Sequence, residues 1–333
     1  MDDGQRLQRM LDAFVGAERA VIMTHDNPDP DSLASAMTLQ VILREKLGLP
    51  SLIVYGGILG RAENRQMVSA LGIPAVALET TRLRPQDRIA LVDTQPLTGN
   101  NSLPEGIIPA MVVDHHPLRL ETVAATHYDV REGFGATATL AYRYLKAARI
   151  RPSRALATAL FVAIKVETRD LTREVSPADT EAYQALLPLV DRRAIAEIDH
   201  APVSRQYFRT LGQAIEGTSL YGPVAVAGLG NIEAPEIVAE YADMLGRLEG
   251  IRWVLSAGVY EDDLYLSIRT NQEEAHAGSL IQALVRGLGK AGGHGSMAGG
   301  RIPLTRSYQE TLEEVRERFL NLMGADHMQG EPL

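Results

Sequence analysis

The chain has 333 residues, a length that suggests two domains rather than one. Hydrophobic residues make up 45% and charged residues 23% of the chain, a globular composition that excludes wholesale disorder. The formal net charge of −9 argues against wrapping of long duplex nucleic acid, because that binding depends on phosphate neutralisation. The chain has no cysteine, so disulfides, zinc–thiolate sites and iron–sulfur clusters are excluded, and any metal must bind histidines and carboxylates.

The first residues, Met1 to Gly4, do not combine a basic start with an apolar core. No stretch approaches the roughly 18 uninterrupted apolar residues that span a bilayer. We therefore expect neither a signal peptide nor contact with a membrane, and a cytoplasmic location.

Short apolar runs alternate with helical patterns in the first half of the chain, after an opening helix that contains Leu7 and Phe14. Strands are predicted at 20–24, 52–55, 89–92 and 111–113. Helices are predicted near 31–47, 62–71, 135–148, 153–165 and 177–188. This alternation is typical of a parallel sheet covered by helices.

The pattern changes after a polar, helical stretch at 190–218, which we interpret as a connection between domains. A strand at 223–228 and helices at 235–247, 276–289 and 307–322 are predicted. Two apolar runs, 253–260 and 264–269, flank Glu261-Asp262-Asp263, which predicts a hairpin. The second half therefore predicts a smaller α/β domain.

Three polar clusters directly follow predicted strands: His25, Asp29 and Asp31; Asp93; and Asp114, His115 and His116. In open α/β sheets, ligands bind outside the carboxyl ends of the strands, so these clusters can converge on one crevice. Each cluster alone has a plainer interpretation. The first is typical of a turn in which Asp31 caps the next helix, and the others could be a loop cap and an exposed histidine pair.

Taken together, the clusters indicate a bound cation, because five or six carboxylates and imidazoles at one sheet edge repel and desolvate one another without one. Oxygen ligands mixed with imidazole suit Mn²⁺, Mg²⁺ or Fe²⁺ better than a structural zinc. Carboxylates that bridge would hold two metals about 3.5–4 Å apart, the arrangement used for phosphoryl transfer to water.

The pattern His25-x-x-x-Asp29-x-Asp31, followed by Asp93 and by Asp114-His115-His116, resembles the first three motifs of the DHH phosphoesterases. The run Gly292-Gly293-His294-Gly295 resembles the GGH motif of the DHHA1 domain, which accompanies the RecJ-like and nanoRNase/pAp phosphatase branches. The resemblance covers about residues 15 to 320. It implies an α/β fold in which an N-terminal, parallel-sheet DHH domain faces a smaller C-terminal α/β DHHA1 domain across a cleft.

By this resemblance, two Mn²⁺ ions are expected, with Mg²⁺ or Fe²⁺ as alternatives. One ion would be bound by His25, Asp29 and Asp93, and the other by Asp31, Asp93 and His115. Asp93 would bridge the two ions and His116 would face the phosphate, which makes these two the catalytic residues, with Asp114 in support.

The fourth motif of the family usually reads Thr-Asp-Thr, and here the corresponding residues are Val166-Glu167-Thr168. Glu167 is therefore expected to replace the aspartate as a ligand of the second metal, with Asp170 as the substitute if it does not. In the second domain, the resemblance implies a substrate site formed by Arg269, Gly292, Gly293 and His294. A flexible hinge or tight turn is the plainer interpretation of this glycine-rich run.

The resulting domain prediction is a metal-binding catalytic domain at 1–195, a helical linker at 196–218, a substrate-binding domain at 219–325 and a frayed tail at 326–333. The predicted activity is Mn²⁺-dependent hydrolysis of short oligonucleotides, linear dinucleotides or phosphorylated nucleotides such as pAp by metal-activated water. A polyphosphate phosphatase and a catalytically weakened nucleotide-binding sensor are the alternatives. Long duplexes are not expected as partners, and a homodimer is compatible with the sequence.

Overall fold

The computed structural model describes residues 1–272 and 275–333, and for His294 it describes the backbone alone. The chain folds into two compact units, Met1–Ala201 and Pro202–Leu333. The division falls inside the predicted linker, so that α7 (Arg192–Asp199) belongs to the first unit and α8 (Arg205–Glu216) to the second. Nowhere in the described parts of the chain does a helix have the length and apolar composition that crossing a bilayer requires.

The first unit is built on a six-stranded parallel sheet with the strand order β3-β2-β1-β4-β5-β6. Its strands are β1 (Ala20–Met23), β2 (Ser51–Tyr55), β3 (Ala75–Ala77), β4 (Arg88–Val92), β5 (Met111–Asp114) and β6 (His127–Val130). Every residue of β1 and β5 is buried, as expected for central parallel strands covered on both faces. The four predicted strands are confirmed. The two strands that the sequence does not predict, β3 and β6, form the edges of the sheet.

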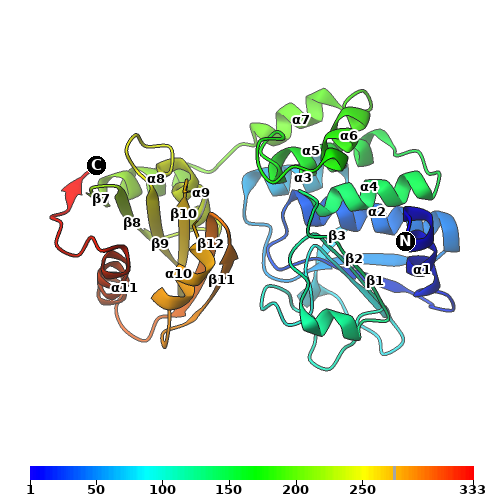
Figure 1. Ribbon diagram of the computed structural model, residues 1–333, viewed down its shortest axis with the longest axis horizontal. Helices are drawn as coiled ribbons and strands as arrows, with labels where there is room; N and C mark the ends of the chain where they lie inside the picture. The colour runs from blue at the N-terminus through cyan, green and yellow to red at the C-terminus, as the bar shows by residue number, and fades with distance from the viewer. Residues whose placement is uncertain (273–274) are drawn as a thin grey trace. The chain divides into compact units, whose positions relative to one another are not determined.

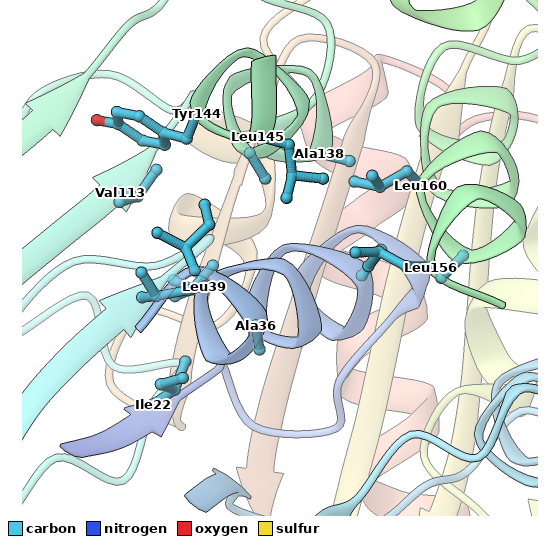
Figure 2. Close-up of a cluster of buried hydrophobic side chains, with 14 of the residues drawn as sticks. Ile22, Ala36, Leu39, Val113, Ala138, Tyr144, Leu145, Leu156 and Leu160 are labelled. Carbon is cyan, nitrogen blue, oxygen red and sulfur yellow. The ribbon is translucent and has the colours of Figure 1, made fainter. Parts of the chain in front are cut away.

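A layer of helices covers one face of this sheet (Figure 1). The helical elements of the first unit besides α7 are α1 (Asp3–Asp12), α2 (Pro30–Leu47), α3 (Ala62–Leu71), η1 (Leu78–Thr80), η2 (Leu120–Ala124), α4 (Thr137–Ala147), α5 (Arg154–Glu167) and α6 (Pro177–Leu186). Figure 2 shows part of one buried apolar cluster, which contains Leu39 of α2, Leu145 of α4, Leu160 of α5, and Ile22 and Val113 of the sheet. The other face buries a smaller apolar cluster.

Helix α2 begins directly after the first polar cluster. Its N-cap is Asp29, whose side chain accepts a hydrogen bond from the N–H of Ser32 at 2.9 Å, and Pro30 occupies the first helical position. The alternative interpretation that Asp31 caps this helix is therefore wrong. Asp31 lies one residue inside the helix, which leaves its carboxylate available for other contacts.

The strand order reverses between β1 and β4. From β1 the chain proceeds to β2 and β3 on one side, and it then returns to β4, β5 and β6 on the other side. In open α/β sheets this reversal leaves a crevice outside the carboxyl ends of the strands. The first and second polar clusters follow the two strands that flank this crevice.

The second unit contains a seven-stranded sheet with the order β11-β12-β10-β9-β8-β7-β13, in which β8 and β9 pair in parallel and the other neighbours pair antiparallel. Its strands are β7 (Thr218–Tyr221), β8 (Val224–Asn231), β9 (Trp253–Tyr260), β10 (Asp263–Thr270), β11 (Lys290–His294), β12 (Met297–Pro303) and β13 (Glu331–Pro332). Its helices besides α8 are α9 (Ile237–Leu245), α10 (Ala277–Leu284) and α11 (Tyr308–Met323).

The predicted hairpin is confirmed by the antiparallel pairing of β9 with β10. Three other features differ from the sequence analysis. The helix predicted at 276–289 ends at Leu284, and Gly292 and Gly293 lie in strand β11 instead of a hinge or tight turn. The predicted frayed tail includes β13, which pairs with β7 because that strand offers unpaired backbone groups at the sheet edge.

Candidate metal centre

The three polar clusters meet at the carboxyl edge of the first sheet. Two groups of side chains have potential ligand atoms within 4.8 Å of one another: His25, Asp29 and Asp93; and Asp93, His115 and His116. Asp93 is common to both groups. The convergence expected from the strand pattern is therefore present, and the shared carboxylate lies where a bridging ligand is needed.

The backbone of Asp93 turns sharply as β4 ends. Its φ of 61° lies in the left-handed region, which aspartate tolerates better than most residues. The N–H of Asp93 still donates to the carbonyl of Val113 at 2.9 Å, so the turn begins while the strand is paired with β5. The hydroxyl of Thr137 donates to Asp93 Oδ1 at 2.8 Å and fixes the orientation of the carboxylate.

The imidazole of His25 is oriented by the backbone of the next residue, Asp26. Its Nδ1 lies 2.9 Å from the carbonyl oxygen of Asp26, and since a carbonyl only accepts, Nδ1 carries a hydrogen. Its Nε2 faces the carboxylates, at 3.4 Å from Asp29 Oδ1 and 3.7 Å from Asp93 Oδ2. A histidine whose other nitrogen is held by a carbonyl is typical of a metal ligand.

His115 repeats this arrangement on the other side of Asp93. Its Nδ1 lies 3.0 Å from the carbonyl oxygen of Phe134. Its Nε2 lies 3.7 Å from Asp93 Oδ1 and 4.0 Å from Asp31 Oδ2. In the second predicted set of ligands, His115 therefore lies close to both Asp31 and Asp93, but Asp31 belongs to neither group of ligand atoms found among the described residues, and His116 stands in its place.

The carboxylate of Asp31 is buried against the N-terminus of α4. The N–H of Thr137 donates to its Oδ2 at 2.8 Å, and the N–H of Ala138 donates to its Oδ1 at 2.6 Å. These amides are among the first of the helix, which have no partner within the helix and favour a negative charge. Asp31 is thus held by the backbone, with its second lone pairs free to bind a cation.

His116 forms a separate pair with Asp114. Its Nδ1 lies 2.8 Å from Asp114 Oδ1, and the Nε2 amide of Gln95 donates to Asp114 Oδ2 at 2.6 Å. Burial lowers the pKa of His116, but Asp114 outweighs burial and raises the pKa to about 10. The hydrogen bond from His116 in turn holds the pKa of Asp114 below its usual range, against the effect of burial. A cationic imidazole held in this way can contact an anion.

The electrostatics of the cluster favour a cation. Burial and the Asp93 carboxylate raise the pKa of Asp31 well above its usual value, and burial and Asp29 do the same for Asp93. Burial lowers the pKa of His25, but Asp29 and Asp93 outweigh it and raise that pKa to about 10. In the metal-free protein, protons therefore offset the clustered negative charge, and a divalent ion can take their place.

Comparisons with known proteins agree with this architecture. The model of the DHH family, N-terminal domain, matches residues 19–164, and the model of the DHHA1 domain matches residues 222–321. The chain therefore contains a DHH family N-terminal domain and a DHHA1 domain. Members of this family are phosphoesterases.

Three similar proteins extend over both domains. An uncharacterized protein of Methanocaldococcus jannaschii is 33% identical over 315 residues, which cover 91% of this chain and 64% of that protein. This chain therefore spans just under two thirds of that relative. The structure of an exopolyphosphatase-related protein from Bacteroides fragilis has a TM-score of 0.76 at 13% identity and covers 95% of this chain and 96% of that one. RecJ from Thermus thermophilus, solved in complex with Mn²⁺, has a TM-score of 0.54 at 14% identity and covers 99% of this chain and 55% of that one.

In the DHH domain, the structure brings Glu167 to the site but not into either group of ligand atoms found among the described residues. Glu167 is the last residue of α5, and its negative charge raises the pKa of both Asp31 and His116. Its Oε1 accepts a hydrogen bond from Nη2 of Arg173 at 3.0 Å. The substitute ligand, Asp170, is exposed and accepts a hydrogen bond from the hydroxyl of Tyr183 at 3.2 Å.

In the DHHA1 domain, the predicted substrate residues lie on β10 and β11, two strands of the same sheet that are separated by β12. Arg269 of β10 is half-buried, and its Nε donates to Asp243 Oδ1 at 2.7 Å. Gly293 has a φ of 152°, and a Cβ there would lie 2.5 Å from the Cα of Ala298, so this position requires glycine. A Cβ at Gly292 would meet nothing within 4 Å, so packing does not explain that glycine. The side chain of His294 lies outside the described structure.

Sequence reasoning missed the residues that support the ligands. The carbonyl of Phe134, the N–H and hydroxyl groups of Thr137 and the N–H of Ala138 hold proposed ligands, yet all three residues lie in one short segment before and within the start of α4. Backbone groups carry no signature in the sequence. A polar Thr137 at the start of an apolar helix was the one available signal.

Proposed function

We propose that this chain is a Mn²⁺-dependent phosphoesterase that hydrolyses short oligonucleotides, linear dinucleotides or phosphorylated nucleotides such as pAp. The observation that carries the proposal is the pair of ligand groups that share Asp93 at the carboxyl edge of the DHH-domain sheet. Such a shared carboxylate suits two divalent ions, and two-metal sites are used for in-line displacement at phosphorus.

The donor set fits this proposal. His25, Asp29 and Asp93 would hold one ion, and Asp31, Asp93 and His115 would hold the other. Mixed imidazole and carboxylate ligands suit Mn²⁺, and the similar RecJ structure contains that ion. When bound, the ions would make a water nucleophilic at neutral pH and offset the charge of the phosphoryl oxygens.

The remaining polar groups would act on the substrate. His116, oriented by the contact of its Nδ1 with Asp114, would donate a hydrogen bond to a phosphoryl oxygen and strengthen that contact as negative charge develops there. Asp114 would orient the imidazole, and the Gln95 amide would keep Asp114 in place. The reaction requires no covalent intermediate with the protein, because water is the nucleophile.

A short substrate accords with the composition of the chain. Its net charge is −9 and its aromatic content 5%, which provide neither a basic track nor a row of stacking side chains for a long single strand. In the DHHA1 domain, Arg269 would bind a remote phosphate and the open space beside Gly292 would admit a base or phosphate.

The test is a substrate panel assayed with Mn²⁺: a linear dinucleotide, pAp, a cyclic dinucleotide and polyphosphate. We expect turnover of the dinucleotide or pAp, its loss in excess chelator, and a decrease of several orders of magnitude in kcat for Asp93→Ala. Asp87→Asn is the matched control, because Asp87 is a buried carboxylate beside the opposite end of the same strand, paired with Arg19. Full activity in chelator would refute the proposal, and turnover of polyphosphate alone would favour the phosphatase alternative. Binding without turnover would favour the sensor.

A further inference from the structure

The carboxylate of Asp179 is fully buried in the DHH-domain unit and belongs to no proposed ligand set. It lies in the first turn of α6, where it forms a capping box with Ser176. Its Oδ2 accepts from the N–H of Gly135 at 2.8 Å and from the N–H and hydroxyl of Ser176 at 2.7 and 2.6 Å. Its Oδ1 accepts from the hydroxyl of Thr139 at 2.5 Å.

Two of these donors, Gly135 and Thr139, are in or next to the segment that holds the proposed metal ligands. We call residues 134–138 the ligand-support segment. It contacts His115 through a carbonyl, Asp31 through two amides and Asp93 through a hydroxyl. Asp179 therefore ties the segment to α6.

The ligand-support segment is also closely packed where Asp179 meets it. A Cβ at Gly135 would lie 2.7 Å from the carbonyl oxygen of Glu174, 2.8 Å from Cγ2 of Thr168 and 3.0 Å from Asp179 Oδ2. Real Cβ atoms do not approach other atoms this closely, so the backbone at Gly135 fits against its neighbours as only glycine can. The hydrogen bonds that Gly135 and Thr139 donate to Asp179, together with this close fit, hold the segment in place.

We propose that Asp179 is a positioning residue for the metal centre, which fixes the ligand-support segment and through it Asp31, Asp93 and His115. The inference rests on the proposed function, because the three residues must bind metal for their positions to matter in this way. The physical reason is that partners outside the ligand shell set ligand orientation, and their loss typically costs about 10–100-fold in metal affinity.

A purely structural role for Asp179 as the cap of α6 predicts something else. Loss of a cap lowers the stability of the fold without changing the geometry of a distant site. Ser176→Ala separates the roles, because it removes the capping hydroxyl and leaves the bond between Asp179 and Gly135. Asp191→Ala is the matched control: Asp191 caps α7 through the N–H groups of Arg193 and Ala194 and contacts no proposed ligand among the described residues.

The experiment is a calorimetric Mn²⁺ titration of the full chain, with the electron paramagnetic resonance spectrum of the loaded protein as a second readout. We expect Asp179→Ala to weaken Mn²⁺ binding about 10–100-fold and to change the spectrum. Asp179→Asn should recover most of the affinity, since its carbonyl oxygen can accept from Gly135 and its amide can donate to Thr139. Ser176→Ala and Asp191→Ala should bind Mn²⁺ as the wild type does.

Wild-type affinity in Asp179→Ala, with a lowered melting temperature alone, would overturn the positioning role and leave the proposed function intact. Absence of Mn²⁺ binding to the wild type would overturn the proposed function itself. Should Asp179→Ala not fold, Asp179→Asn and Gly135→Ala decide the matter. Gly135→Ala pushes the ligand-support segment away from Asp179, because the added Cβ would lie 3.0 Å from Asp179 Oδ2, and it should weaken binding as well; unchanged affinity there would contradict the proposal.

Discussion

Removal of the Glu167 carboxylate distinguishes two roles that its position allows. The side chain lies close enough to the site to raise the pKa of Asp31 and His116, yet its Oε1 is paired with Arg173. If Glu167 binds the second metal, as the fourth family motif implies, Glu167→Ala lowers the affinity of the chain for that metal. If Glu167 only pairs with Arg173, the variant loses one ion pair and keeps both metals.

The two roles differ in magnitude. Loss of a group that binds or orients a ligand costs about 10–100-fold in metal affinity. The side chains of Arg173 and Glu167 are 19% and 24% exposed, and an ion pair in contact with solvent contributes roughly 0.2–1 kcal/mol, about fivefold at most. A loss of tenfold or more in the affinity of one metal therefore indicates that Glu167 binds that metal or orients one of its ligands, and not that it pairs with Arg173 alone.

The assay is a metal titration of the wild type, Glu167→Ala, Glu167→Gln and Asp170→Ala. We expect two sites in the wild type, one of them weakened at least tenfold in Glu167→Ala and less in Glu167→Gln. Asp170→Ala should change the metal affinity only slightly, because the Asp170 side chain is exposed. Glu167→Asp should be active but no faster than the wild type, since a shift of about 1 Å at a reacting centre can cost around a hundredfold. Two retained metals and full turnover in Glu167→Ala, together with loss of metal in Asp170→Ala, would show that we assigned the wrong carboxylate.

Three other predictions follow from the pKa shifts and the second unit. Mn²⁺ binding should release protons and become tighter as the pH rises from 6 towards 9, because the pKa of His25 is about 10 and an imidazole must be neutral to bind metal. Calorimetry in two buffers of different ionisation enthalpy checks this, and equal binding heats in the two buffers would contradict it. Arg269→Ala should keep its metals and lose roughly 2–4 kcal/mol in kcat/KM, and loss of metal instead would show that the two domains do not divide binding from chemistry. Burial raises the pKa of Asp129, but Arg131 and Tyr144 outweigh it and hold the pKa below its usual range, so its contribution to stability is present above a pH of about 4 and disappears as the pH falls further. Asp129→Asn should cost roughly 3 kcal/mol at pH 7 and make acid unfolding shallower, as measured by urea denaturation across pH.

The fold class could be predicted from the sequence because its evidence is local. The four central strands are short apolar runs, and each run stands next to turn residues or a helical pattern. The edge strands β3 and β6 could not be predicted in this way. In β6, polar residues interrupt the apolar pattern: Asp129 is buried, where it pairs with Arg131 and accepts a hydrogen bond from the hydroxyl of Tyr144.

The candidate ligands could also be predicted, since His25, Asp29 and Asp93 each follow a strand that ends at the same edge of the sheet. Their supports could not. Thr137 and Asp31 are 106 residues apart in the chain, and the amide that joins them exists at every position except proline. The pairing of Glu167 with Arg173 was missed for a different reason, because a single like-charged substitution in a motif does not show what else the side chain contacts.

In the metal-free site, groups of the chain itself offset the negative charge of the clustered carboxylates. Asp31 and Asp93 are buried side by side, and their charges would destabilise the unit if nothing offset them. The N-terminal amides of α4, the hydroxyl of Thr137 and the protons of His25 supply that offset from within the chain. The proposed ligands are therefore held in place by the chain itself, unlike those of small zinc domains that fold only around their metal. Under the proposed function, binding would exchange protons for an ion at a site that is already built.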